Sequence, residues 1–135
     1  ASSMRIDRGN CVIEVGHIHY SQLLQRKPAA TEAIFLLMRR IFEDVGYRRY
    51  EWKCDDKNAR SRAAAERLGF TYEGTFRQAV VYRSRNRDTA WYSIIDSEWP
   101  AIRTAFERWL APENFSADGG QIMSLVDIRA GLSQA

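Results

Sequence analysis

The chain has 135 residues, the size of a single domain, and 45% of them are hydrophobic, which favours a packed core over intrinsic disorder. Its net charge is +3, but basic residues are interleaved with acidic ones and form no basic helix stripe, which argues against nucleic-acid binding. A signal-peptide pattern, a membrane-length apolar run and CxxC or Cys/His spacing are absent from the sequence, so we expect a cytosolic protein with two reduced thiols and no metal.

The first half of the chain predicts two strands and a long helix. Residues 4–7 end a first strand, and alternation over residues 11–20 predicts a second. A polar, Pro-containing turn over residues 22–30 follows. Apolar residues at helical spacing then predict a helix to residue 45, which Gly46 terminates as a C-cap glycine would.

The next segment repeats the strand–turn–helix order. Residues 47–54 predict a strand whose Tyr50, Trp52 and Cys54 face one way, opposite to their charged neighbours. Residues 61–68 then predict a short Ala-rich helix, and Gly69 ends it.

The last part of the chain predicts a long antiparallel hairpin and a closing helix. Residues 70–82 and 88–96 form the hairpin, and residues 83–87 its polar turn. Residues 99–110 form the helix, and residues 111–135 a partly ordered tail with one short helix. The order β-β-α-β-α-β-β-α predicts an α/β fold with a mixed central sheet flanked by helices.

The turn before the long helix is a candidate anion site. Unbonded amides and the positive end of the helix dipole meet there, Arg26 and Lys27 add charge, and the small residues Ala29 and Ala30 permit close approach of a ligand to the backbone. An ordinary capped helix explains the same residues.

Two polar residues at the start of the short helix form a second candidate. Asn58 follows a strand, and Ser61 lies one turn further on, so both side chains can face one ligand. The alternative is that Asn58 is a helix N-cap, which is a common use of asparagine.

Glu14, His17 and His19 lie along the strand that precedes the first turn. A carboxylate or imidazole at this place can take a proton from an amine, directly or through water. A histidine in a strand is more commonly a hydrogen-bonded structural residue, and two histidines without a third ligand make a weak case for zinc.

The residues in these turns and strands resemble the GNAT superfamily of acyl-CoA-dependent N-acetyltransferases, nearest to the branch that acetylates ribosomal-protein N-termini. The specific part is the run Asn58-x-x-Ser61 followed by Gly69-Phe70-x-x-Glu73-Gly74. The matching segments are IEVGHIHYS (13–21), QRKPAATEA (25–33), NARSRAAAERLGF (58–70), YEGTFRQ (72–78) and RNRDTAWYS (85–93).

The resemblance implies that acetyl-CoA is the cosubstrate and that a primary amine of a small molecule or protein N-terminus attacks its thioester directly. It places pantetheine at the end of the second strand, the pyrophosphate on the loop amides and Ser61 near the departing thiolate. Glu14 or a chain of water molecules is the candidate base. The residues it assigns to acetyl-CoA are Ile18, His19, Tyr20, Gln25, Arg26, Lys27, Ala29, Ala30, Thr31, Asn58 and Ser61.

The chain departs from the family pattern in three places. Pro28 replaces a loop glycine and lacks an amide, and Ala65 stands where many relatives carry a tyrosine acid. The resemblance also includes no counterpart of the family's first strand, the two helices after it or its second strand. We therefore expect an N-terminally truncated GNAT domain over residues 1–110 and an extension over residues 111–135. Alternatively, the chain is a non-catalytic CoA-binding or self-association module; a dimer is expected through exposed sheet edges.

Overall fold

The structure is a computed structural model of the chain and describes residues 1–132. These residues form two compact units. The sheet unit comprises residues 1–18 and 47–95, and the helical unit comprises residues 19–46 together with the segment from Asp96 onward. The last three residues of the predicted tail lie outside the described part.

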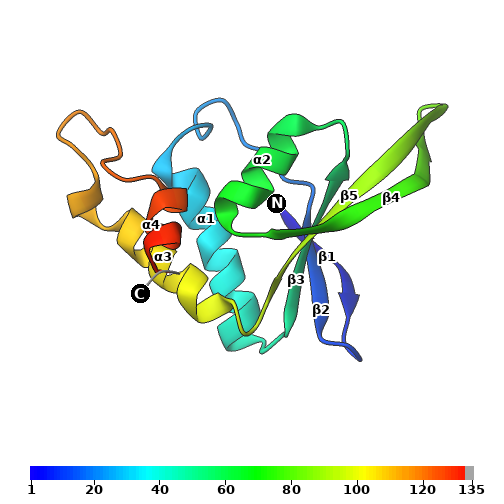
Figure 1. Cartoon of the computed structure of the whole chain (residues 1–135), viewed down its shortest axis with the longest axis horizontal. Helices are drawn as coiled ribbons and strands as arrows, with labels where there is room; N and C mark the ends of the chain where they lie inside the picture. The colour runs from blue at the N-terminus through cyan, green and yellow to red at the C-terminus, as the bar shows by residue number, and fades with distance from the viewer. Residues whose placement is uncertain (133–135) are drawn as a thin grey trace. The chain divides into compact units, whose positions relative to one another are not determined.

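The sheet unit holds one five-stranded mixed sheet in the order β1-β2-β3-β5-β4 (Figure 1). β2 and β3 are parallel, and the other neighbouring pairs are antiparallel. The predicted α/β fold and the predicted order of the elements are therefore confirmed. The elements of this unit are β1 (Ser2–Asp7), β2 (Val12–Gly16), β3 (Arg49–Asp55), α2 (Ala59–Leu68), β4 (Thr71–Tyr82) and β5 (Arg85–Ile95).

The two faces of the sheet differ in chemistry. On one face Tyr50, Trp52 and Cys54 are buried, and the ring of Phe70 packs 5.5 Å from that of Trp52. Trp52 also bonds to Ser61, which places α2 on this apolar face. The opposite face carries the charged residues of β3, as the alternation in the sequence predicts.

The second strand is shorter than predicted. It ends at Gly16, and His17 takes a left-handed conformation with φ of 48°. Residues 17–20 therefore do not continue the strand, and the prediction that His17 and His19 lie along it is wrong. Left-handed backbone breaks the alternation on which that prediction depended.

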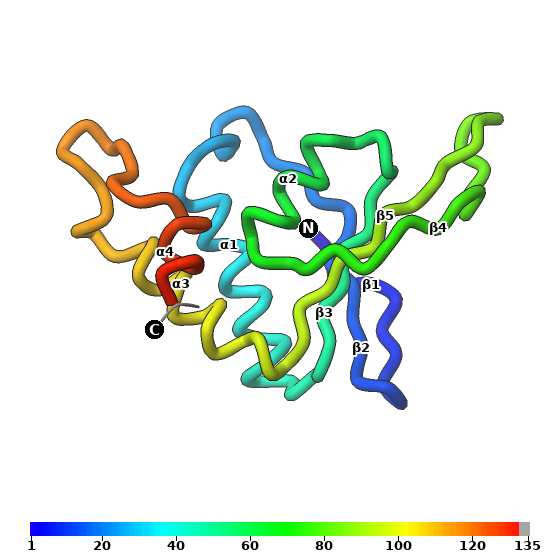
Figure 2. Tube along the Cα trace, viewed as in Figure 1, coloured from blue at the N-terminus to red at the C-terminus, as the bar shows by residue number. Residues whose placement is uncertain are grey.

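The hairpin turn is tighter than predicted. Arg83 and Ser84 both have positive φ, 50° and 57°, as a two-residue type I′ turn requires. β5 therefore begins at Arg85, and Arg87 belongs to the strand instead of the turn. The hairpin of β4 and β5 extends well beyond β3 (Figure 2).

The helical unit is built on α1 (Pro28–Arg39) and α3 (Trp99–Leu110). The ring of Phe35 stacks on Phe106 at 5.2 Å and on Trp99 at 6.1 Å, so the apolar stripes of the two helices meet. The predicted long helix is present, but its last turn is the π-helical segment η1 (Arg40–Asp44). Gly46, with φ of 72°, follows it as predicted.

Asn114 holds the segment after α3. Its buried side chain donates from Nδ2 to the carbonyls of Trp109 and Met123 at 3.0 and 3.1 Å, and its Oδ1 accepts from the amide of Met123 at 2.9 Å. The short helix expected in the tail is α4 (Leu125–Leu132), which follows this loop and the 3₁₀ turn η2 (Pro112–Asn114).

Candidate functional site

The pairing between the two parallel strands stops before β3 ends. β2 and β3 pair from Val12 with Arg49 to Val15 with Trp52, whereas β3 continues to Asp55. The residues of β3 beyond Trp52 therefore have no partner in β2. This early end leaves backbone polar groups at the strand ends available to another molecule.

The residues predicted to pair with pantetheine lie beyond that strand end. Ile18 belongs to the sheet unit, whereas His19 and Tyr20 belong to the helical unit. The strand end itself is at Gly16. The assumption that residues 18–20 form the end of the strand is thus corrected.

Asn58 begins α2 as an N-cap. Its Oδ1 accepts a hydrogen bond from the amide of Ser61 at 3.1 Å. The structure therefore brings the two predicted residues together and also confirms the simpler reading of Asn58 as a cap. Its Nδ2 is not used in this cap and can still donate to a ligand.

The hydroxyl of Ser61 is positioned by a tryptophan. Trp52 Nε1 donates to Ser61 Oγ at 3.0 Å, so the serine oxygen acts as an acceptor and its own proton remains to be donated. Burial raises the pKa of the neighbouring Cys54 thiol, although its contact with Ser61 opposes the shift. Ala65, one helical turn further on, is fully buried.

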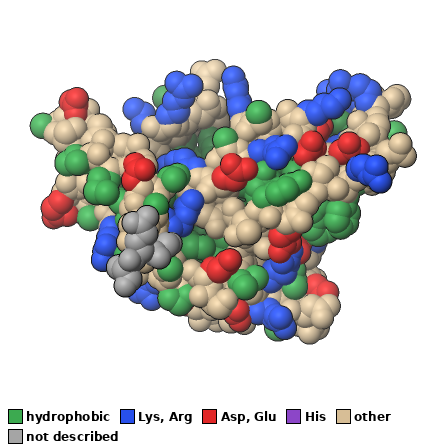
Figure 3. All heavy atoms as spheres, viewed as in Figure 1, with side chains coloured by type: hydrophobic (Ala, Val, Ile, Leu, Met, Phe, Trp, Pro, Cys, Tyr) green, Lys and Arg blue, Asp and Glu red, His purple; other side chains and the backbone are tan. Residues whose placement is uncertain are grey.

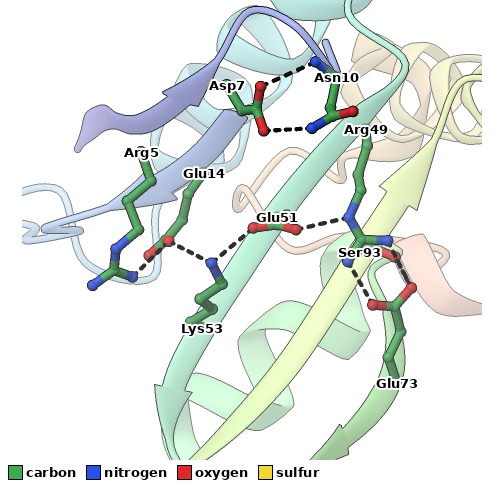
Figure 4. A network of polar contacts seen from close by, with 9 residues as sticks. All are labelled: Arg5, Asp7, Asn10, Glu14, Arg49, Glu51, Lys53, Glu73 and Ser93. Atoms are coloured by element: carbon green, nitrogen blue, oxygen red, sulfur yellow. Dashed lines mark hydrogen bonds and ion pairs between the residues drawn. The ribbon is translucent and has the colours of Figure 1, made fainter. Parts of the chain in front are cut away.

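Glu14 is buried on the polar face of the sheet and is paired with two cations. Its Oε2 lies 2.8 Å from Arg5 Nη1 and 3.1 Å from Lys53 Nζ (Figure 4). Lys53 also lies 2.8 Å from Glu51, and its ammonium sits 3.8 Å from the centroid of the Trp91 ring. Glu14 Oε1 makes no hydrogen bond to any residue in the described part of the chain, so one oxygen remains to accept a proton.

The polar contacts continue across β3 to the far edge of the sheet. Arg49 donates one hydrogen bond to Glu51 at 2.7 Å and two to the carboxylate of Glu73, at 2.8 and 2.6 Å (Figure 4). Ser93 also donates to Glu73, at 2.7 Å. The hydrogen bond from Arg49 lowers the pKa of Glu73, and the bond to Glu73 raises the pKa of Arg49. Burial raises the pKa of Glu51, but its bonds to Lys53 and Arg49 outweigh burial and leave it lowered.

A pocket of about 560 Å³ opens on this polar face, within the sheet unit. A bulge in β1 turns both Met4 and Arg5 toward it, since the register with β2 shifts after Met4. We call it the sheet-face pocket. It is lined by Met4, Arg5, Glu14, Gly16, His17, Lys53, Phe76, Ala79, Val80, Arg87, Thr89 and Trp91.

Of the residues that line this pocket, the sequence pattern points to Glu14 and His17 but not to most of the others. Lys53 was visible as a member of the charged side of β3, yet nothing marked it as a partner of Glu14. The predicted hairpin has Arg87 in its turn and Trp91 within its second strand, and neither position pointed to a pocket. Strand pairing across β3 is the missing signal, because it places Trp91 opposite Lys53.

The loop before α1, in the helical unit, uses several of its own amides. The carbonyl of Ser21 accepts from the amides of Leu24 and Gln25 at 3.0 Å, and Gln25 Nε2 donates to the carbonyl of Tyr20 at 3.0 Å. The amides of Lys27 and Ala30 are bonded to the carbonyls of Leu24 and Lys27.

Fewer amides are therefore available to an anion than the loop length suggests. Pro28 lacks an amide, whereas the amides of Arg26 and Ala29 make no hydrogen bond within residues 1–132. Lys27 is the N-cap of α1 but gives no side-chain cap, so this helix start stays uncapped by its own residues.

The histidines do not form a metal site. His17 lines the sheet-face pocket, whereas His19 does not. Within residues 1–132, no three side chains of His, Cys, Asp or Glu gather closely enough to hold a metal ion.

Among the described residues, the surface carries no block of one charge on the face that is drawn, and the helices are short. Basic and acidic side chains are interspersed over the face drawn in Figure 3. Among residues 1–132, no helix has the length and apolar character needed to cross a membrane.

Three comparisons place the chain among known proteins. Residues 2–71, about half of the chain, match the family model described as acetyltransferase (GNAT) domain. The crystal structure of a GCN5-related N-acetyltransferase from Brucella melitensis is similar, with a TM-score of 0.94 and 55% identity over 96% of this chain and 58% of that one. The curated protein named "Putative ribosomal N-acetyltransferase YdaF", from Bacillus subtilis (strain 168), is 29% identical over 70% of this chain and 51% of its own length.

The microcin C7 self immunity acetyltransferase MccE, solved in complex with acetyl-CoA and AMP, is also similar. Its TM-score is 0.59 and its identity 32%, over 67% of this chain and 49% of that one. The chain thus spans about half the length of the curated relative it matches, and 58% of the Brucella protein. The match of the family model over half of the sequence, together with the sheet order, shows that the chain belongs to the GNAT acetyltransferase family.

Proposed function

We propose that the protein is an acetyl-CoA-dependent N-acetyltransferase that acts on a primary amine of a small molecule or a protein N-terminus. The family supports acetyl transfer, and the observation that carries the proposal is the early end of the β2–β3 pairing at Val15 and Trp52. Unpaired backbone beyond that point is a suitable partner for the amides of a pantetheine arm. MccE, a relative of this chain, was solved with acetyl-CoA.

Each unit supplies its own proposed contacts with acetyl-CoA. In the helical unit, these are His19, Tyr20 and the loop residues Gln25, Arg26, Lys27, Ala29, Ala30 and Thr31. The unbonded amides of Arg26 and Ala29 and the uncapped start of α1 support an anion there. In the sheet unit, the proposed contacts are Ile18, Asn58 and Ser61.

The proposed reaction is a direct transfer. The amine nitrogen attacks the thioester carbonyl carbon, a C–N bond forms, and the C–S bond breaks with departure of the CoA thiolate. The nitrogen loses a proton, for which Glu14 Oε1 is the candidate acceptor. Ser61 can donate a hydrogen bond to the departing thiolate, since its oxygen accepts from Trp52 and its proton is free to point at the sulfur; the thiolate then takes its proton from solvent.

Calorimetric titration with CoA and acetyl-CoA tests the binding step, and thiol release over a panel of amines tests the transfer. Binding of acetyl-CoA together with amine-dependent thiol release supports the proposal. Absence of binding at millimolar concentration removes it in every CoA-dependent form.

A second candidate is a non-catalytic CoA-binding or self-association module. It is favoured by the buried Ala65 at the position where many family members carry a tyrosine acid, and by Pro28 in the loop. This reading expects CoA binding, flat thiol release over the whole panel, and a dimer in sedimentation analysis.

A further inference from the structure

We propose that the sheet-face pocket binds a ligand that carries a carboxylate, through three hydrogen-bond donors of β5. The donors are Arg87 Nε, Thr89 Oγ1 and Trp91 Nε1. We further infer that this ligand is the amine acceptor, a step that rests on the function proposed above. The acceptor would then carry its amine at one end and its carboxylate at the other.

The three donors share one face of the sheet. Arg87, Thr89 and Trp91 alternate along β5, and Trp91 pairs with Lys53 of β3, whose side chain lies on the polar face. All three residues line the sheet-face pocket. They therefore point into the same space as Glu14 and Lys53.

The three polar atoms are buried without a partner. Arg87 Nε, Thr89 Oγ1 and Trp91 Nε1 make no hydrogen bond within residues 1–132, and the Thr89 side chain belongs to a residue that is only 6% exposed. Burial of an unpaired polar group is costly, and native proteins satisfy nearly all of them. Three such atoms in a single pocket indicate that a ligand completes their hydrogen bonds.

The charge pattern shows which kind of ligand fits. Lys53 and Arg5 are committed to carboxylates of the sheet, whereas Arg87 has no carboxylate partner in the described part of the chain. An unpaired guanidinium beside a hydroxyl and an indole N–H favours an oxyanion. Phe76 and Val80 add an apolar wall, which favours an organic carboxylate over an inorganic anion.

The distance between Glu14 and the donors of β5 sets the length of the ligand. Glu14 is on β2 and the donors are on β5, with β3 between them, so about 10 Å of sheet separates the two strands. Glu14 also lies opposite Ser93 across Glu51, so the donors, which precede Ser93 on β5, are displaced further along the strand. An amine beside Glu14 and a carboxylate beside Arg87 cannot belong to one α-amino acid. A longer ω-amino acid or a short peptide spans this distance.

The test uses three probes of one length: 8-aminooctanoic acid, its carboxamide, and octylamine. Binding to the full chain, without acetyl-CoA, is followed by the NMR shift of the Trp91 indole N–H, assigned with Trp91→Phe. We expect the acid to bind at least tenfold more tightly than the other two. Equal binding of the three probes, or no binding of the acid at millimolar concentration, overturns the proposed site.

Variants separate recognition from folding. Arg87→Gln should weaken binding of the acid about tenfold and leave octylamine unchanged, whereas Arg85→Gln on the same strand should change neither. Thr89→Val should weaken binding several-fold and raise the unfolding temperature of the ligand-free protein, since it removes an unsatisfied buried hydroxyl. A lower unfolding temperature for Thr89→Val would assign the hydroxyl a structural role and contradict the proposal.

Acetylation of the probe is measured separately by thiol release with acetyl-CoA. Acetylation of 8-aminooctanoic acid at lower KM than octylamine supports its role as an acceptor mimic. If the acid binds and shifts the Trp91 signal but octylamine alone is acetylated, the acceptor assignment fails. If the acid binds and no amine is acetylated, the proposed enzymatic function fails and the carboxylate site remains.

Discussion

The ammonium of Lys53 lies 3.8 Å from the centre of the Trp91 ring while it also contacts Glu14 and Glu51. One side chain of β3 thereby joins β2 to β5 on the polar face. Its side chain is only 9% exposed, so these charge contacts are largely shielded from water. Lys53 is therefore a cation on which two carboxylates depend.

Replacement of Lys53 by methionine should destabilise the protein. The two buried carboxylates Glu14 and Glu51 would lose a partner, and removal of one member of such a group costs about 3 kcal/mol. Urea unfolding followed by circular dichroism measures the change. Lys57→Met, at an exposed position, is the matched control, and a similar effect of both variants would contradict the argument.

Stability should fall in acid through Glu73. Its pKa is lowered by the hydrogen bond from Arg49, so the folded state binds this proton less readily than the unfolded state. The stabilisation is complete above the ordinary pKa of the carboxyl and is lost as the pH falls through the lowered value. The free energy of unfolding, measured between pH 6 and pH 3, should decrease less steeply for Glu73→Gln than for the unmodified chain. Glu113→Gln, on the exposed surface of the other unit, should keep the original slope.

Asn58 and Ser61 should differ in what they contribute. Asn58→Ala removes the cap of α2 and should cost about 1 kcal/mol of stability, whereas Asn58→Asp should restore most of it. Thermal unfolding of the two variants checks this. A loss of acetyl-CoA affinity that persists in the stable Asn58→Asp variant would show a direct contact of the carboxamide with the ligand.

Ser61→Ala should reduce turnover more than acetyl-CoA binding. If the hydroxyl stabilises the departing thiolate by a hydrogen bond, kcat should fall about tenfold or more at saturating substrate, while the calorimetric Kd of acetyl-CoA changes less. Arg85→Ala serves as the control because it lies at the hairpin turn. An unchanged kcat for Ser61→Ala would show that the hydroxyl does not stabilise the leaving thiolate.

Gly16→Ala should disturb the wall of the sheet-face pocket. An added Cβ would lie 2.0 Å from Met4 Sδ, so the methionine would have to leave its position. We expect a loss of about 1–2 kcal/mol in unfolding free energy, as for other overpacked sites. Met4→Ala in the same chain should recover part of it. A double-mutant cycle with no coupling would exclude the steric explanation.

Helical and strand periodicity predicted the order of the elements correctly, and Gly46 and Gly69 end their helices as expected. Periodicity misplaced the ends of strands where the backbone turns left-handed at a single residue or a pair of residues. His17 turns left-handed immediately after β2, and Arg83 with Ser84 closes the hairpin in two residues although five polar residues suggested a longer turn. The positions with positive φ, at His17, Arg83 and Ser84, hold no glycine. The sequence therefore gives no glycine signal for a left-handed backbone there.

The candidate site was only half visible from the sequence. Asn58 caps α2 and Ser61 lies in its first turn, three residues on, so spacing alone could place them together. Glu14 and Lys53 are far apart in the chain, and their contact depends on strand pairing, which periodicity does not specify. The hydrogen-bond donors of β5 could not be predicted as part of the site for the same reason, because only strand pairing brings them near Lys53.

The band of ion pairs across the polar face has a consequence for how its residues can change. It balances three cations against three carboxylates: Arg5, Arg49 and Lys53 against Glu14, Glu51 and Glu73. Loss of a single member leaves an excess charge in a poorly hydrated layer, whereas a coordinated exchange of opposite members keeps neutrality. Sequence drift on this side of the sheet is thus expected to proceed by compensated double replacements, with single ones tolerated chiefly at the solvent-facing ends of the band.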